Sequence, residues 1–273
     1  MLNLREIHKP ATIQDALKLL QQPGIFALAC GTQLIAEKRR EVRAVVDLSA
    51  LVLAYIRERD GAVAIGATTT LAALAESPIL RALANGVVAE AAHRSASSIL
   101  RNQATVAGTL IAEPEGVLAV ALLALDARVT VVSGETRTIP LSAFLHARAA
   151  LLQGALLTEI TLPLTNPRAA LQTVARTPSD KPIVCVVASA RIENGSAREV
   201  RVALGGVGEV AVRANTAEKA LEGQALNDAA IENALKHVTD SLSPIGDFRG
   251  SAEYRQEMAI VLTRRAVKEL ARG

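Results

Sequence analysis

The sequence predicts an α+β protein built from two N-terminal subdomains and a C-terminal domain. Segments typical of helices and of strands are interleaved up to residue 163, whereas a long hairpin at 182–208 is followed by helical segments alone. Two strand pairs turn at Ser133-Gly134 and at Asn194-Gly195, which predicts antiparallel sheets. Half of the residues are hydrophobic and 21% are charged, so the chain can bury a sizeable core.

The first segments predict a small subdomain over about 1–55. Residues 8–24 have the pattern of a helix, because apolar residues recur on one face and Thr12 can cap its start. Residues 25–29 predict a short buried strand that runs into a turn at Gly31, and 44–51 predict a second strand.

Residues 56–163 predict a second subdomain, which completes a first domain over 1–163. Its segments in chain order are a strand, turn and helix at 61–80, a helix at 80–94, a polar stretch with strand-like parts at 99–116, a wholly buried helix at 117–127, a hairpin at 128–141 and a strand at 154–167. Pro163 and Pro167 interrupt this last strand, so we place the domain boundary there.

The C-terminal domain, 164–273, is expected to be a sheet covered by helices. Its hairpin at 182–208 precedes helical segments at 216–223, 228–242 and 251–271. Ser251 is positioned to cap the last of these helices.

Composition argues against a nucleic-acid partner. Aromatic residues make up only 2% of the chain and Trp is absent, which disfavours platforms that stack on nucleobases. The 30 basic residues nearly balance the 27 acidic ones, and the densest basic run, at 37–41, has Glu at both ends. We therefore interpret this run as a solvated turn.

The cysteines and the apolar segments indicate a cytoplasmic protein without membrane insertion. Cys30 and Cys185 lie in no Cys-x-x-Cys pattern, so we expect neither a disulfide framework nor a zinc or iron–sulfur cluster held by this chain. The N-terminus has no signal-peptide pattern. The longest apolar stretch, near 117–127, is broken by Asp126 and is too short to span a bilayer.

The turn at 29–33 leaves two interpretations open. Gly31 tolerates a positive φ, which is all that a tight turn requires. A phosphate cradle requires more, namely consecutive backbone N–H groups that face one point. Cys30 within this turn is either a thiol whose pKa the N–H groups lower or a small residue that replaces Gly.

Nine stretches together carry a family resemblance. They include LACGTQLI and SILRNQATVAGTL, and they occupy 8–20, 28–35, 45–51, 65–80, 98–110, 122–129, 156–163, 202–207 and 249–266. In order and spacing they resemble the flavoprotein (medium) subunit of the molybdenum hydroxylases, the family of xanthine dehydrogenase and carbon monoxide dehydrogenase. The resemblance covers essentially the whole chain.

The resemblance implies an FAD-binding domain in two halves, of the vanillyl-alcohol-oxidase/PCMH type, followed by a domain like the C-terminal domain of the carbon monoxide dehydrogenase flavoprotein. In this family two Gly-rich loops, here at 29–33 and 105–109, hold the cofactor diphosphate, and a third stretch at 66–70 lies near the flavin. No catalytic side chain and no metal ligand are implied. The cofactor-binding residues implied by position are Ala29, Cys30, Gly31, Thr32, Gln33, Leu34, Thr69, Thr105, Ala107, Gly108, Thr109, Val117 and Leu118.

The FAD loops depart from the family pattern. Cys30 and Ala107 stand where the family prefers Gly, which would cost about 1 kcal/mol at any position that needs a positive φ. Val117 stands where the family has an Asp that contacts the adenosine half of FAD, and Thr173 replaces a Lys near the flavin. The segment 113–115 adds two carboxylates near an anionic cofactor, and like charges at short range are unfavourable.

The resemblance implies a flavin electron-transfer subunit. It would pass electrons from [2Fe–2S] clusters through FAD to an external acceptor, with an iron–sulfur subunit and a molybdopterin large subunit as partners. The substrate would be bound in the large subunit. The departures in the loops favour an alternative, a scaffold or assembly subunit that keeps the fold without binding FAD.

Overall fold

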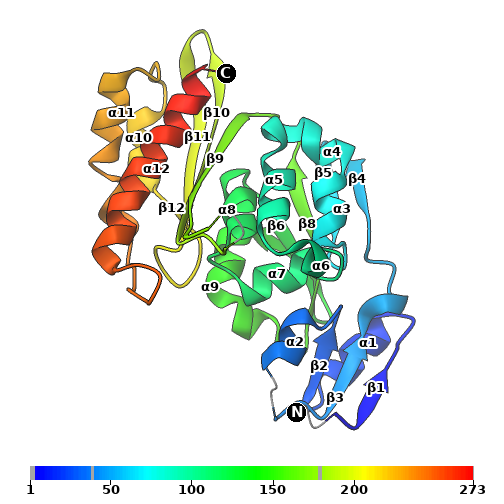
Figure 1. Ribbon diagram of the computed structural model, residues 1–273. Coiled ribbons are helices and arrows are strands. Elements are labelled where there is room, and N and C mark those ends of the chain that lie inside the picture. The colour runs from blue at the N-terminus through cyan, green and yellow to red at the C-terminus, as the bar shows by residue number, and fades with distance from the viewer. Residues whose placement is uncertain (1–3, 38–39, 178–179, 273) are drawn as a thin grey trace.

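Three separate β-sheets organise the chain (Figure 1). The computed structural model describes residues 4–37, 40–177 and 180–272. One sheet lies in the N-terminal subdomain, one in the second subdomain and one in the C-terminal part. This α+β architecture agrees with the predicted one.

The first sheet is small and parallel. Its strand order is β1 (Glu6–His8), β3 (Ala44–Asp47) and β2 (Ile25–Leu28), and the connecting helices are α1 (Ile13–Leu20), α2 (Thr32–Glu37) and the short 3-10 turn η1 (Leu48–Ala50). Thr12 caps α1 as predicted, because its hydroxyl accepts a hydrogen bond from Asp15 N at 3.1 Å.

The second sheet is antiparallel and has five strands. Their order is β4 (Ile56–Arg59), β5 (Ala62–Gly66), β8 (Leu156–Pro163), β6 (Arg128–Val132) and β7 (Thr136–Pro140). The predicted turn at Ser133-Gly134 is confirmed, with Gly134 at φ 101°. The helices of this subdomain are α3 (Leu71–Glu76), α4 (Pro78–Ala82), η2 (Leu83–Gly86), α5 (Val87–Arg94), α6 (Ser98–Arg101), α7 (Val106–Ala112), α8 (Val117–Ala124) and α9 (Leu141–Leu151).

The predicted single helix at 80–94 is wrong, because the chain breaks between α4 and α5. Ala84, Asn85 and Gly86 adopt φ values of 48°, 56° and 74°, all in the left-handed region. The break is held by long-range bonds: Ala84 N donates to Asn166 Oδ1 at 2.8 Å, and Ala169 N donates to Asn85 Oδ1 at 3.2 Å. Contacts with a distant segment thus override a local helix pattern.

The strand-like parts predicted at 99–116 are also wrong, because this stretch forms α6 and α7. Thr105 caps α7, and its hydroxyl accepts from Gly108 N at 3.2 Å. The one β-type pairing that the described stretch makes is an isolated bridge between Thr70 and Thr105. A capping threonine before small residues starts a helix here, although β-branched residues alone favour strands.

The third sheet is antiparallel and carries helices on one face. Its strand order is β12 (Val212–Arg213), β11 (Ser196–Gly205), β10 (Val184–Glu193) and β9 (Arg168–Val174), and its helices are α10 (Asn215–Leu221), α11 (Asp228–Leu235), η3 (Val238–Ser241) and α12 (Ala252–Arg272). Asn194 and Gly195 both have positive φ at the predicted hairpin turn, as a type I′ turn requires. Ser251 caps α12 as predicted, with Tyr254 N donating to its hydroxyl. In Figure 1, α12 runs along β9 and β10.

Helix α8 joins the second and third sheets into one core. All eight of its residues are buried, as predicted from its apolar sequence, and it contacts β10 and β11. Across this contact Ser189 Oγ donates to Ala124 O at 2.6 Å, and Ala211 N donates to Pro114 O at 2.8 Å. The hydrophobic core therefore continues across the boundary that the prolines suggest in the sequence.

No single helix in the described ranges is long and apolar enough to cross a membrane. Helices α7 and α8 reach the necessary length and composition only as a pair, and they are bent by 106° at the break between them.

Gly205→Ala should destabilise the protein by about 1–3 kcal/mol, because an added Cβ would force packed atoms apart. The Cβ would lie 2.2 Å from Glu115 O and 2.6 Å from Val120 Cγ2, so α8 would have to move away from β11. Urea unfolding measures the change. Gly208→Ala is the matched control, since the nearest atom to its Cβ is 3.7 Å away; equal stability of the two variants would show that α8 is not tightly packed there.

Candidate functional site

The first Gly-rich loop ends in a helix whose first N–H groups are free. Gly31 has a φ of 77°, and α2 begins directly after it with Ile35 N donating to Gly31 O. Within the described part of the chain, the N–H groups of Thr32, Gln33 and Leu34 have no hydrogen-bond acceptor. Three such groups at a helix start face the same direction, which suits an anion.

Only Gly31 in this loop needs the conformational freedom of glycine. A Cβ there would lie 3.0 Å from both Leu28 Cδ1 and Ile35 Cδ1, in addition to the strain of a positive φ. Neither Cys30 nor Ala107 has a positive φ. The backbone cost considered for these two replacements of Gly therefore does not arise.

The surroundings of Cys30 favour the interpretation that it is a small residue in place of Gly rather than a reactive thiol. It is exposed, and its pKa is raised, first by partial burial of the sulfur and then by the charge of Asp47. A reactive thiol would need the opposite shift. The hypothesis of a lowered thiol pKa in this loop is wrong.

The second Gly-rich loop has the opposite character, because its N–H groups are already bonded. The donors and acceptors are Val106 N to Thr69 O at 2.9 Å, Ala107 N to Ala67 O at 3.2 Å, Gly108 N to Thr105 Oγ1 at 3.2 Å and Thr109 N to Thr105 O at 2.9 Å. These bonds fix the loop to the third predicted stretch, 66–70. The N–H groups of residues 106–109 are therefore not available to a ligand, and the loop can offer only its small side chains and the Thr109 hydroxyl.

The Thr69 side chain links the stretch 66–70 to Tyr55. Its side chain is buried, donating to Tyr55 O and accepting from Tyr55 N, both at 3.0 Å. Tyr55 in turn donates its phenol hydrogen to Glu159 Oε2 at 2.7 Å. The Thr69 hydroxyl therefore holds the chain where it passes from the first sheet to the second.

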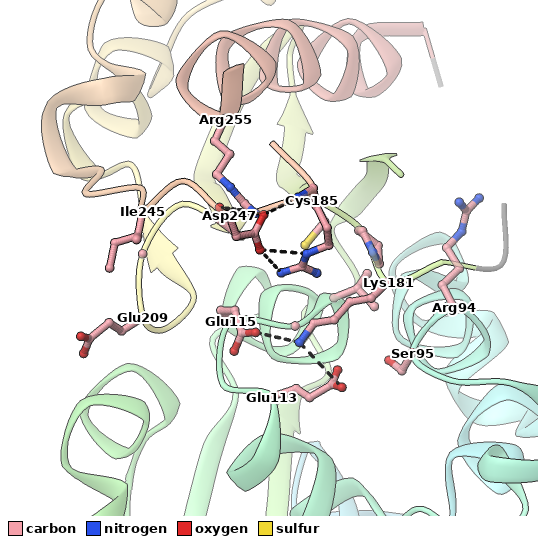
Figure 2. A pocket seen from close by; sticks show the side chains of 16 residues that line it. Arg94, Ser95, Glu113, Glu115, Lys181, Cys185, Glu209, Ile245, Asp247 and Arg255 are labelled. Carbon is pink, nitrogen blue, oxygen red and sulfur yellow. Dashed lines mark hydrogen bonds and ion pairs between the residues drawn. The ribbon is translucent and has the colours of Figure 1, made fainter. Parts of the chain in front are cut away.

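A pocket of about 350 Å³ lies at the start of α8, between the second subdomain and the C-terminal sheet (Figure 2). Its walls include Arg94 at the end of α5, the segment 113–117, and Lys181 with Cys185 at the start of β10. Val117 is the one predicted cofactor residue among those that line it, while Leu118 beside it is fully buried in the core. The two Gly-rich loops lie outside this lining.

The two added carboxylates share one lysine. Lys181 Nζ lies 2.8 Å from Glu115 Oε1 and 3.7 Å from Glu113 Oε1, as Figure 2 shows. Burial raises the pKa of Glu113, which Lys181 opposes and the charge of Glu115 reinforces. Thr173, at the position of the family lysine, accepts from Arg94 Nη1 at 3.2 Å. Nothing in the sequence around Lys181 indicated this role.

Comparison with known proteins decides the family. A model described as the FAD binding domain in molybdopterin dehydrogenase matches residues 3–165, and one for the CO dehydrogenase flavoprotein C-terminal domain matches 169–270. The chain belongs to the FAD-binding subunits of the molybdenum hydroxylases. The predicted family and two-part architecture are confirmed, whereas the predicted limits at residues 55 and 163 remain predictions.

Relatives of this flavoprotein subunit span nearly its whole length. It is 31% identical to the 6-hydroxypseudooxynicotine dehydrogenase complex subunit alpha of Paenarthrobacter nicotinovorans, covering 94% of this chain and 90% of that one. It is 30% identical to the carbon monoxide dehydrogenase medium chain of Afipia carboxidovorans, covering 96% and 95%. The structure of reconstituted CO dehydrogenase from Oligotropha carboxidovorans superimposes with a TM-score of 0.89 at 27% identity, covering 98% and 97%. The chain is therefore an oxidoreductase subunit, as predicted.

Arg255 fixes the other wall of the pocket in this subunit. It is 4% exposed and donates from Nη1 to Ile183 O and Gly206 O, each at 2.7 Å, and from Nη2 to Asp247 Oδ1 at 2.8 Å. Desolvation raises the pKa of the Asp247 carboxyl, but hydrogen bonds from Arg249 and Arg255 outweigh it and hold that pKa well below its usual range. The Arg255 guanidinium thus links α12 to the start of β10 and to the end of β11.

Cys185 lies behind this wall as a core residue, as its apolar strand predicts. It is 2% exposed, and burial raises the pKa of its thiol to about 12, with the charge of Glu115 adding to the shift. The thiol therefore stays protonated at neutral pH.

Arg255→Lys should destabilise the protein by about 3 kcal/mol, because a lysine cannot satisfy acceptors spread around the guanidinium plane. Urea unfolding at neutral pH measures the loss. Arg265→Lys, an exposed change on the same helix, is the control. A loss no larger than that of the control would mean that the buried bonds of Arg255 contribute little.

Glu113→Gln should stabilise the protein near neutral pH. The pKa of Glu113 is raised in the folded state above the ordinary 4.5, so the fold prefers the uncharged carboxyl, and ionisation costs stability as the pH rises through the folded pKa. Below about pH 4 wild type and variant should melt alike, since Glu113 is then protonated in both folded and unfolded chains. Melting temperatures from about pH 4 to 8 test this, with Glu257→Gln on α12 as an exposed control; a variant less stable than wild type at neutral pH would contradict it.

Proposed function

We propose that this chain is the flavin electron-transfer subunit of a molybdenum hydroxylase complex, in which electrons from [2Fe–2S] clusters of a partner reach an external acceptor by way of FAD. The observation that carries the proposal is the set of free N–H groups of Thr32, Gln33 and Leu34, directly after a glycine that no larger residue can replace without strain. They lie within the part of the chain that matches the FAD-binding domain.

The first loop fits the diphosphate of FAD. Three consecutive N–H groups and the positive end of the α2 dipole offer charge-assisted hydrogen bonds to phosphate oxygens. The Thr32 hydroxyl adds one more donor at the same helix start. When bound, FAD supplies a redox centre that exchanges electrons singly or in pairs.

The second loop supports the same cofactor in another way. Gly108 has no side chain and Ala107 has only a buried methyl group, so little covers the backbone here, and the internal bonds of the loop hold it in place. A Cβ on Gly108 would lie 3.0 Å from Thr105 Oγ1, so glycine also permits the cap that starts α7. We infer that this loop shapes the cofactor site while the first loop supplies the donors.

The partners follow from the class of complex. Relatives are named as a medium chain of carbon monoxide dehydrogenase and as a subunit of a dehydrogenase complex. We propose that this chain assembles with an iron–sulfur subunit and a molybdopterin large subunit, and that the large subunit binds the substrate.

A scaffold without FAD is the second candidate, and the bonded N–H groups of the second loop favour it. If both loops were needed as donors, a chain with only one donor loop would hold the cofactor poorly. The experiment on the first loop separates the two functions.

Gly31→Ala should raise the dissociation constant of FAD at least tenfold, about 1.4 kcal/mol, while Gly61→Ala should leave it unchanged. Both glycines have a positive φ, so each variant carries similar backbone strain, but the Cβ at Gly61 meets no atom within 4 Å. Titration of the purified wild type and both variants with FAD, followed by flavin fluorescence, gives the constants. Unchanged affinity in Gly31→Ala would refute binding at this loop, and absence of binding by the wild type would favour the scaffold.

A further inference from the structure

The segment 113–116 is held in place by its backbone, so both of its glutamates are anchored at the wall of the pocket. Gly116 N donates to Glu113 O at 2.9 Å, and Ala211 N donates to Pro114 O at 2.8 Å from the C-terminal domain. Glu115 O packs so closely on Gly205 that an added Cβ would come within 2.2 Å of it. With the backbone fixed, a basic side chain from another segment can offset the negative charge of this one.

Lys181 is that cation in the described part of the pocket. Its amine contacts both carboxylates, and it enters from the segment before β10, across the pocket from α8 (Figure 2). The other basic side chains of the pocket have nearer partners. Arg249 and Arg255 each pair with Asp247 at 2.8 Å, and Arg94 pairs with Glu90 at 2.8 Å.

We infer that Glu113, Lys181 and Glu115 form an internal counter-ion unit that keeps this pocket, which is lined by the expected cofactor position Val117, from repelling an anionic dinucleotide cofactor. The inference rests on the proposed function, since it takes FAD as the ligand. Lys181 acts here as a positioning residue through the carboxylates, without contact with the cofactor. An anionic ligand therefore meets a compensated pocket in which neither carboxylate stands alone.

Burial makes this compensation matter. Glu113 lies where desolvation already disfavours its charge, and screening by water is weaker in a pocket than on an open surface. Without Lys181, Arg249 is the remaining basic group that favours the charged form of Glu113, while the charge of Glu115 opposes it. Removing the carboxylates together with the lysine should restore the balance.

FAD titration of three variants of the full chain tests the unit. Lys181→Met should weaken FAD binding at least tenfold, and the combined variant Glu113→Gln, Glu115→Gln, Lys181→Met should return to within about threefold of the wild type. Lys219→Met, an exposed change on α10, is the control and should bind like the wild type. Circular dichroism melts verify that each variant is folded.

Two results would overturn the inference. If Lys181→Met binds FAD as well as the wild type, the unit has no effect on the ligand. If the combined variant binds as weakly as Lys181→Met, the lysine acts by direct contact and the counter-ion role is wrong.

A readout without FAD keeps this inference separate from the proposed function. NMR titration of the Glu113 carboxyl carbon should give a higher pKa in Lys181→Met than in the wild type, because a neighbouring positive charge that lowers this pKa is lost. An unchanged pKa would refute the counter-ion unit even if FAD binds. If the wild type binds no FAD but the pKa of Glu113 rises in Lys181→Met, the proposed function and the role toward the cofactor fail, while the charge compensation itself stands.

Discussion

The burial of α8 against the C-terminal sheet is the contact on which the rest of the structure depends. A helix that is apolar on every side has no face for water, so it is stable only when protein surrounds it. Helices α5, α7 and α9 cover it from the second subdomain, and β10 and β11 cover it from the other side. Because one helix belongs to both cores, the two parts of the chain stay in a fixed relation without a rigid linker between them.

The pocket is a consequence of this contact. The chain must leave α7, turn and enter α8 where the two parts meet, so the segment 113–116 becomes part of the rim. The same contact brings Lys181 and the hydrogen-bonded Arg255 side chain from the C-terminal part to that rim. Charged side chains from segments far apart in the sequence thus lie together around the start of α8, whose own residues are apolar.

The two Gly-rich loops illustrate how one kind of sequence serves two structural tasks. In the first, a glycine at positive φ precedes a helix whose N–H groups remain free. In the second, Thr105 caps the helix, and the N–H groups of Val106 and Ala107 donate to carbonyl oxygens of the segment that follows β5. A small replacement such as Cys30 or Ala107 is tolerated at both, because neither position requires the left-handed region.

The sequence by itself determined the elements that local patterns specify: the Thr12 and Ser251 caps, the hairpin turns at Ser133-Gly134 and Asn194-Gly195, and the buried α8. The order of its motifs also determined the family. Only the tertiary structure decided the break at 83–86 and which loop keeps free donors, because acceptors such as Asn166 and Thr69 lie far away in the chain. The pairing of Lys181 with two glutamates is likewise tertiary, since the two segments meet only when α8 packs on the C-terminal sheet.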